Sequence, residues 1–162
     1  MEFVREVKPH QCTLVPDETG QFTSDHGWDI SRDGAKLKPI IDELIDLNVR
    51  VSLFMDADVS AMAAVKALGA HRIELYTEPY AAHFGTSLEV ATLARYADTA
   101  KAAQSLGLGV NAGHDLNLAN LPTFIRAVPD VLEVSIGHAL IGDALEYGLA
   151  DTVRRYRAAL RH

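Results

Sequence analysis

Hydrophobic and polar positions along the chain alternate between two periods, one typical of strands and one typical of helices. Short runs rich in apolar and β-branched residues predict five β-strands, at residues 11–15, 49–55, 72–76, 109–112 and 132–136. Stretches with apolar residues at helical spacing lie between them, and no Asn-Gly hairpin signal joins two strands. This strict alternation predicts an α/β fold with parallel strands and right-handed crossovers.

Local start and stop signals support the helical stretches. The predicted helices lie at residues 40–47, 60–68, 86–107, 122–127 and 151–160. Gly69 follows the second of them as a C-terminal cap, and residues 86–89 (TSLE) have the pattern of a capping box. Pro122 lies early in its helix, where its missing N–H does little harm. The polar stretch at residues 17–33 predicts a long working loop.

Two architectures fit this pattern: an open doubly wound sheet and part of a closed barrel. An open sheet usually carries nearly continuous apolar strands. Here polar residues recur within or just after the strands, namely Ser52, Asp56, Asp58, Glu74, Asn111, His114, Ser135 and His138. The carboxyl ends of barrel strands face one mouth, where such groups converge. We therefore predict part of a (β/α)₈ barrel, a TIM barrel, with residues 1–162 as a single domain.

Composition narrows the possible partners and location. The chain has 162 residues, 48% hydrophobic and 23% charged, which is typical of a globular domain with its own core. Its net charge of −7 disfavours nucleic acid and anionic membranes as partners. Cys12 is the only cysteine, so no internal disulfide can form. With no apolar run typical of a signal peptide or membrane span, we expect a cytoplasmic location.

Two strand ends carry candidate chemistry. In residues 110–115 (VNAGHD), small residues permit a sharp turn that would place His114 over the barrel mouth, where it can transfer a proton. A solvent-facing loop histidine is the alternative. In residues 136–142 (IGHALIG), Gly137 permits close backbone approach, and the free N–H groups of the next turn can bind an anion. The alternative there is a glycine needed only for a tight turn.

Glu74 and the loop at residues 22–29 (FTSDHGWD) are weaker candidates. A carboxylate within an apolar strand is costly to bury unless it is paired or used, so Glu74 either faces the barrel interior or forms a helix-facing ion pair. The hydroxyls, histidine and glycine of the loop suit a polyol or phosphate ligand, although such loops are often merely solvated. A less favoured alternative is a metal site made by Asp56, Asp58, His114 and His138.

Six stretches taken together carry a more specific signal. They are residues 11–18 (QCTLVPDE), 22–29 (FTSDHGWD), 51–58 (VSLFMDAD), 72–81 (RIELYTEPYA), 106–116 (LGLGVNAGHDL) and 135–144 (SIGHALIGDA). In order and approximate spacing, this set resembles the pyridoxine 5′-phosphate synthase family, also called the PdxJ family. The resemblance implies a condensation without metal or cofactor. In it, 1-deoxy-D-xylulose 5-phosphate and 3-amino-2-oxopropyl phosphate give pyridoxine 5′-phosphate, inorganic phosphate and water.

The resemblance also implies roles for individual residues. His114 matches the family's proton donor, and Glu74 matches the glutamate that stabilises the transition state. Thr23 matches a contact to the deoxyxylulose phosphate. Contacts to the amino-oxopropyl phosphate are expected from Asp115, Gly137 and His138. Some family members have glycine at the position of Asp115; a contact through the backbone would tolerate this difference, whereas an anionic side chain near the phosphate would repel it.

The resemblance covers the last five of the family's eight strands, strands 4–8. The family's Asn-x-Asp-His motif, its His-Leu-Arg-Glu motif and a catalytic glutamate belong to the first three strands, so we expect this polypeptide alone to be inactive and prone to associate. The family acts on phosphorylated small molecules and forms homo-oligomers, typically octamers. Two alternative hypotheses are a non-catalytic truncated remnant that acts as an assembly partner, and another phosphate-binding barrel enzyme.

Overall fold

The computed structural model describes residues 1–17, 20 and 23–161; Glu18 and Phe22, which belong to the stretches compared above, lie outside the described residues. The elements are α1 (Glu2–Val7), β1 (Gln11–Leu14), α2 (Ile30–Asp46), β2 (Arg50–Met55), η1 (Val59–Ala61), α3 (Met62–Ala67), β3 (Arg72–Leu75), α4 (Glu78–His83), α5 (Glu89–Ser105), β4 (Gly109–Gly113), α6 (Leu121–Ala127), β5 (Val131–Ser135), α7 (His138–Tyr147) and α8 (Leu149–Ala159). None of the helices in these ranges has both the length and the apolar character needed to span a bilayer.

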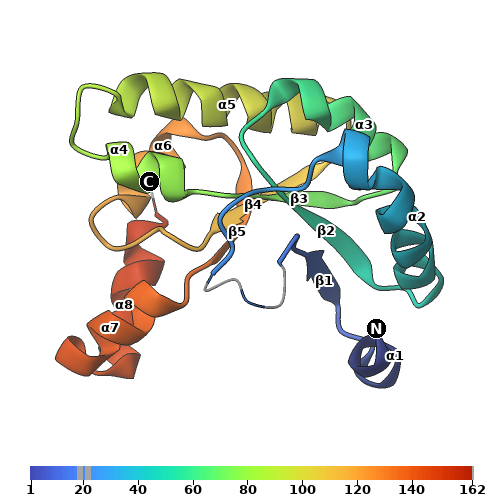
Figure 1. Cartoon of the computed structure of the whole chain (residues 1–162). Helices are drawn as coiled ribbons and strands as arrows, with labels where there is room; N and C mark the ends of the chain where they lie inside the picture. The colour runs from blue at the N-terminus through green and yellow to red at the C-terminus, as the bar shows by residue number, and fades with distance from the viewer. Residues whose placement is uncertain (18–19, 21–22, 162) are drawn as a thin grey trace.

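The sheet distinguishes the two predicted architectures. All neighbouring strands are parallel, and the strand order follows the chain, β1-β2-β3-β4-β5. A doubly wound sheet reverses its strand order at a switch point, whereas a (β/α)₈ barrel winds in one direction. The described strands wind in one direction, with α2, α3 and α5 along one side of the sheet (Figure 1). The prediction of an α/β fold of partial-barrel type is confirmed.

The two faces of the sheet differ in chemistry, because alternate residues of a strand point to opposite faces. The helix-covered face carries Cys12, Leu14, Val51, Leu53, Met55, Ile73, Leu75, Val110, Ala112 and Val134. The other face carries Gln11, Thr13, Arg50, Ser52, Phe54, Arg72, Glu74, Asn111, Gly113, Glu133 and Ser135. This mostly polar second face explains why polar residues interrupt the apolar strands at every other position.

Side chains from all five strands meet on the polar face near the amino ends of the strands. Glu133 on β5 accepts a hydrogen bond from Gln11 on β1 (3.3 Å). It also forms ion pairs with Arg50 (3.2 Å) and Arg72 (2.7 Å), and Arg72 donates to Asn111 (3.0 Å). A contact between β1 and β5, with three strands between them, requires the sheet to curve strongly toward this side. We call it the concave face.

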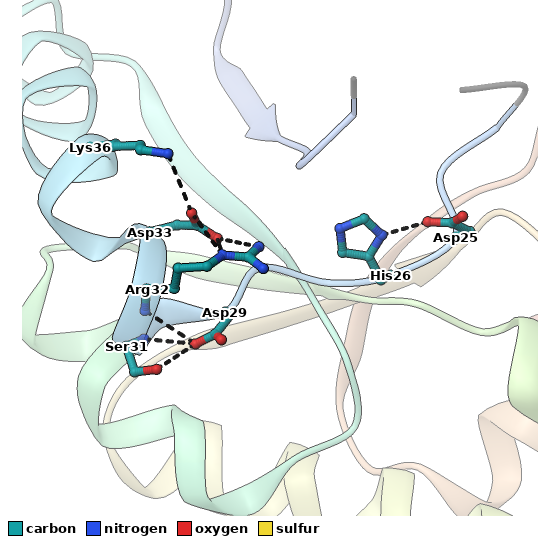
Figure 2. Close-up of polar contacts among 7 residues, drawn as sticks. All are labelled: Asp25, His26, Asp29, Ser31, Arg32, Asp33 and Lys36. Atoms are coloured by element: carbon teal, nitrogen blue, oxygen red, sulfur yellow. Dashed lines mark hydrogen bonds and ion pairs between the residues drawn. The ribbon is translucent and has the colours of Figure 1, made fainter. Parts of the chain in front are cut away.

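The first long helix begins earlier than the sequence pattern predicts. The Asp29 carboxylate caps α2, accepting from the backbone N–H groups of Ser31 (3.0 Å) and Arg32 (3.2 Å) and from the Ser31 hydroxyl (Figure 2). The predicted loop at residues 17–33 therefore ends at Asp29, and its last four residues are helical. The helix buries Ile41 and Leu44.

The remaining predicted elements hold with small changes. Each strand lies within about one residue of its predicted bounds, and Gly69 adopts a positive φ of 98° after α3. The capping box at residues 86–89 is wrong in detail, because α5 begins at Glu89 itself. Glu89 accepts from the backbone N–H of Gly85 (2.9 Å), while the Thr86 hydroxyl accepts from the backbone N–H of Leu88 (3.2 Å).

Candidate active site

The carboxyl ends of the strands form a pocket of about 330 Å³ on the concave face. It is lined by Thr13, Val15, Ser24, Phe54, Glu74, His114 and Ser135. The pocket thus brings together residues of β1, β2, β3 and β5, the residue that follows β4, and the loop before α2. Glu74 and His114, predicted separately from the sequence, lie in the same site.

Glu74 reaches this pocket from the middle of β3 and is only 8% exposed. The Thr13 hydroxyl donates to its Oε2 atom (3.2 Å), so the alternative of a helix-facing ion pair is wrong. Burial raises the pKa of the Glu74 carboxyl; the Thr13 hydrogen bond and the charge of His114 oppose this, and the charge of Glu133 adds to it. Because the folded-state pKa is raised, the contribution of Glu74 to stability is greatest at low pH. That contribution is lost as the pH rises through the raised value.

The role of Thr13 gives a test of this electrostatic arrangement. Thr13→Val keeps the shape of the side chain but removes the donor to the Glu74 carboxylate, so the pKa of Glu74 should rise further. A ¹³C NMR titration of the Glu74 carboxyl carbon would measure this change, with Thr13→Ser as a control that keeps the hydroxyl. An unchanged or lower pKa in Thr13→Val would contradict the arrangement.

His114 is held tightly for a residue that ends a strand. Its backbone N–H donates to the Ser135 carbonyl (2.7 Å), and its φ of 67° lies in the left-handed region. The ring stands edge-on to Phe54, with 6.1 Å between ring centroids. Its Nε2 atom lies 3.1 Å from the Thr23 hydroxyl, and the side chain is 27% exposed. These contacts argue against a solvent-facing loop histidine, and they place Thr23 beside the pocket.

Asp115 follows His114 in the chain, and Gly137 and His138 follow β5, whose Ser135 lines the pocket. The Asp115 Oδ2 atom is 3.7 Å from His114 Nδ1. Burial raises the pKa of the Asp115 carboxyl, and the charges of His114 and His138 oppose this rise. Gly137 caps α7 with a φ of −103°, and a Cβ there would meet no described atom within 4 Å. Packing within the described chain therefore does not require glycine at position 137.

A larger pocket, of about 560 Å³, lies between the start of α2 and η1. Its carboxylates already have structural partners. Asp29 and Asp58 cap α2 and η1, and Asp56 accepts from the backbone N–H of Gly27 (3.1 Å). Within residues 1–17, 20 and 23–161, no group of three or more His, Cys, Asp or Glu side chains is arranged to hold a metal ion. We therefore place the candidate chemistry in the smaller pocket with Glu74 and His114.

Comparison with known proteins identifies the family. Residues 1–162 match the family described as "Pyridoxal phosphate biosynthesis protein PdxJ". The chain belongs to the PdxJ family. It is 60% identical over 152 residues to a pyridoxine 5′-phosphate synthase of Albidiferax ferrireducens, covering 94% of this chain and 60% of that protein. A synthase of Xylella fastidiosa is 57% identical over 94% of this chain and 58% of its own length. A synthase from Xanthomonas campestris pv. campestris is 56% identical over 99% of this chain and 62% of its own length.

The chain thus spans about three-fifths of the length of these PdxJ relatives. Within that span, the sequence singled out Thr23, Glu74 and His114, which the structure brings together. It did not single out Thr13, because a threonine within a strand is common for its β-propensity alone. Only the curvature of the sheet shows that this hydroxyl reaches Glu74, across the intervening strand β2.

Proposed function

We propose that this chain provides the His114 side of the active site of a pyridoxine 5′-phosphate synthase. The reaction would be the ring-closing condensation of 1-deoxy-D-xylulose 5-phosphate with 3-amino-2-oxopropyl phosphate. The observation that carries the proposal is the shared pocket of Glu74 and His114 at the carboxyl ends of parallel strands. The names of the three relatives support the same reaction.

In this proposal, His114 donates a proton to an oxygen that leaves as water. A histidine suits this step because it can carry a proton near neutral pH and release it within the pocket. Glu74 lies in the same pocket and, when ionised, stabilises positive charge that develops on the condensing amine. The Thr23 hydroxyl, beside His114 Nε2, contacts the deoxyxylulose phosphate. The charge of His114 and the Thr13 hydrogen bond both favour the ionised form of Glu74.

The second phosphate would bind at the start of α7. The first turn of this ten-residue helix has no side-chain cap, so its N–H groups are suited to an anion. Gly137 and His138 provide this end, and the charge of His138 acts on the Asp115 carboxyl. As further parts of the proposal, the protein acts in the cytoplasm and forms a homo-oligomer, octameric as in its family.

A complementation assay tests the proposed activity. The chain would be combined with the segment of the Albidiferax ferrireducens synthase that it does not cover, and pyridoxine 5′-phosphate formation would be measured. We expect turnover by the assembly of the two pieces and none by either piece alone. Binding of the pieces without turnover would instead support an assembly partner. Full turnover by the isolated chain would contradict our assignment of part of the site to the added segment.

A further inference from the structure

One buried side chain, that of Thr77, contacts the backbone on both sides of His114. Thr77 follows β3 and is completely buried. Its hydroxyl donates to the Gly113 carbonyl and accepts from the backbone N–H of Asp115 (3.3 Å), which is shared with the Gly113 carbonyl (2.9 Å). A single oxygen atom therefore connects the end of β3 to the residues on both sides of His114.

This arrangement matters because His114 needs to be held. Residues other than glycine rarely adopt a positive φ, and such conformations persist only when the surroundings determine them. The backbone N–H of His114 is bonded to Ser135 on β5, which fixes one side of the turn (2.7 Å). Thr77 fixes the other side, from β3. The imidazole thereby packs against both Phe54 and Tyr76 and lines the pocket of Glu74.

We propose that Thr77 is a positioning residue for His114. Its hydroxyl holds the turn at residues 113–115 in the conformation that presents the imidazole to the substrate. Thr77 does not line the pocket, so it acts through His114 and not by contact with substrate. The consequence for turnover rests on the proposed function, whereas the effect on the turn does not.

Two replacements separate this role from ordinary burial of a threonine. Thr77→Val removes the hydroxyl and keeps the volume, while Thr77→Ser keeps the hydroxyl. Thr152→Val is the matched control, because Thr152 is also completely buried and its hydroxyl has no hydrogen-bond partner within the described structure. Amide hydrogen exchange of the peptide at residues 113–116, followed by mass spectrometry, reports on the turn itself.

In the complemented assembly, we expect Thr77→Val to speed exchange of the Asp115 amide. We also expect it to lower kcat by about tenfold to a hundredfold, as misplacement of a reacting group does. The KM for deoxyxylulose phosphate should change by less than about twofold, since Thr77 touches no substrate. Thr77→Ser and Thr152→Val should retain both slow exchange and kcat. If Thr77→Val matches Thr152→Val in exchange and kcat, the proposal is wrong.

The unaltered protein provides a second measurement in case Thr77→Val does not fold. The Asp115 amide must then exchange much more slowly than the same amide in an unfolded peptide, and free exchange would overturn the proposal. The two proposals can also fail separately. If His114→Gln leaves turnover unchanged, the assigned role of His114 fails, while faster exchange in Thr77→Val would still establish that Thr77 holds the turn.

Discussion

His114→Gln should lower kcat of the complemented assembly by about 10²-fold to 10⁴-fold, the usual contribution of a positioned general acid. Glutamine retains hydrogen-bonding groups near the same place but cannot carry a transferable proton. The backbone bond from residue 114 to Ser135 is unaffected by the change, so the fold should be retained. Steady-state formation of pyridoxine 5′-phosphate measures the effect.

His10→Gln is the matched control for this replacement. His10 is exposed and precedes β1, away from the residues that line the pocket. It should leave kcat within about twofold of the unaltered value, as expected of a surface change distant from the chemistry. Equal activity of His114→Gln and His10→Gln would remove His114 from the mechanism.

Gly113→Ala should destabilise the fold by about 3 kcal/mol, at the upper end of the usual cost of overpacking. A Cβ at this position would lie 2.2 Å from the Ser135 carbonyl oxygen and 2.7 Å from its nitrogen. Both contacts are with backbone, which cannot rotate away as a flexible side chain can. Strands β4 and β5 would have to separate where Gly113 pairs with Ser135, next to the turn of His114.

Gly142→Ala should have the opposite effect on stability from Gly113→Ala. Gly142 lies within α7, and a Cβ there would meet nothing within 4 Å. Alanine in a helix interior is favoured over glycine, so the replacement should stabilise by about 0.5–1 kcal/mol. Urea unfolding would measure both variants. A Gly113→Ala protein as stable as Gly142→Ala would show that the close approach of β4 and β5 is wrong.

Much of the fold follows from local sequence signals. The five strands were predictable because apolar residues on the helix-covered face alternate with polar residues on the concave face, as in Ser52 between Val51 and Leu53. The start of α2 was missed because Asp29 belongs to a polar stretch that reads as loop. Its capping role becomes visible only when the following turn is seen to be helical. Short α4 was also missed, since six residues give little periodic signal.

The site was predictable in its residue types but not in its connections. Glu74 and His114 could be proposed because a carboxylate within a strand and a histidine at a strand end are unusual. The contacts that hold them join residues distant in the chain: Thr13 lies 61 positions from Glu74, and Thr77 lies 36 from Gly113. Such contacts depend on the curvature and register of the sheet, which no local pattern encodes.

The most direct test of the account is a crystal structure of the complemented assembly soaked with inorganic phosphate. Inorganic phosphate is a product of the proposed reaction and serves as a probe for the phosphate site. We predict phosphate on the backbone N–H groups at the start of α7, at Gly137 and His138, in a cavity that also contains the Glu74 carboxyl and the His114 imidazole. Phosphate bound elsewhere, with Gly137 opening onto a different surface from Glu74 and His114, would contradict the central claim of one shared active site.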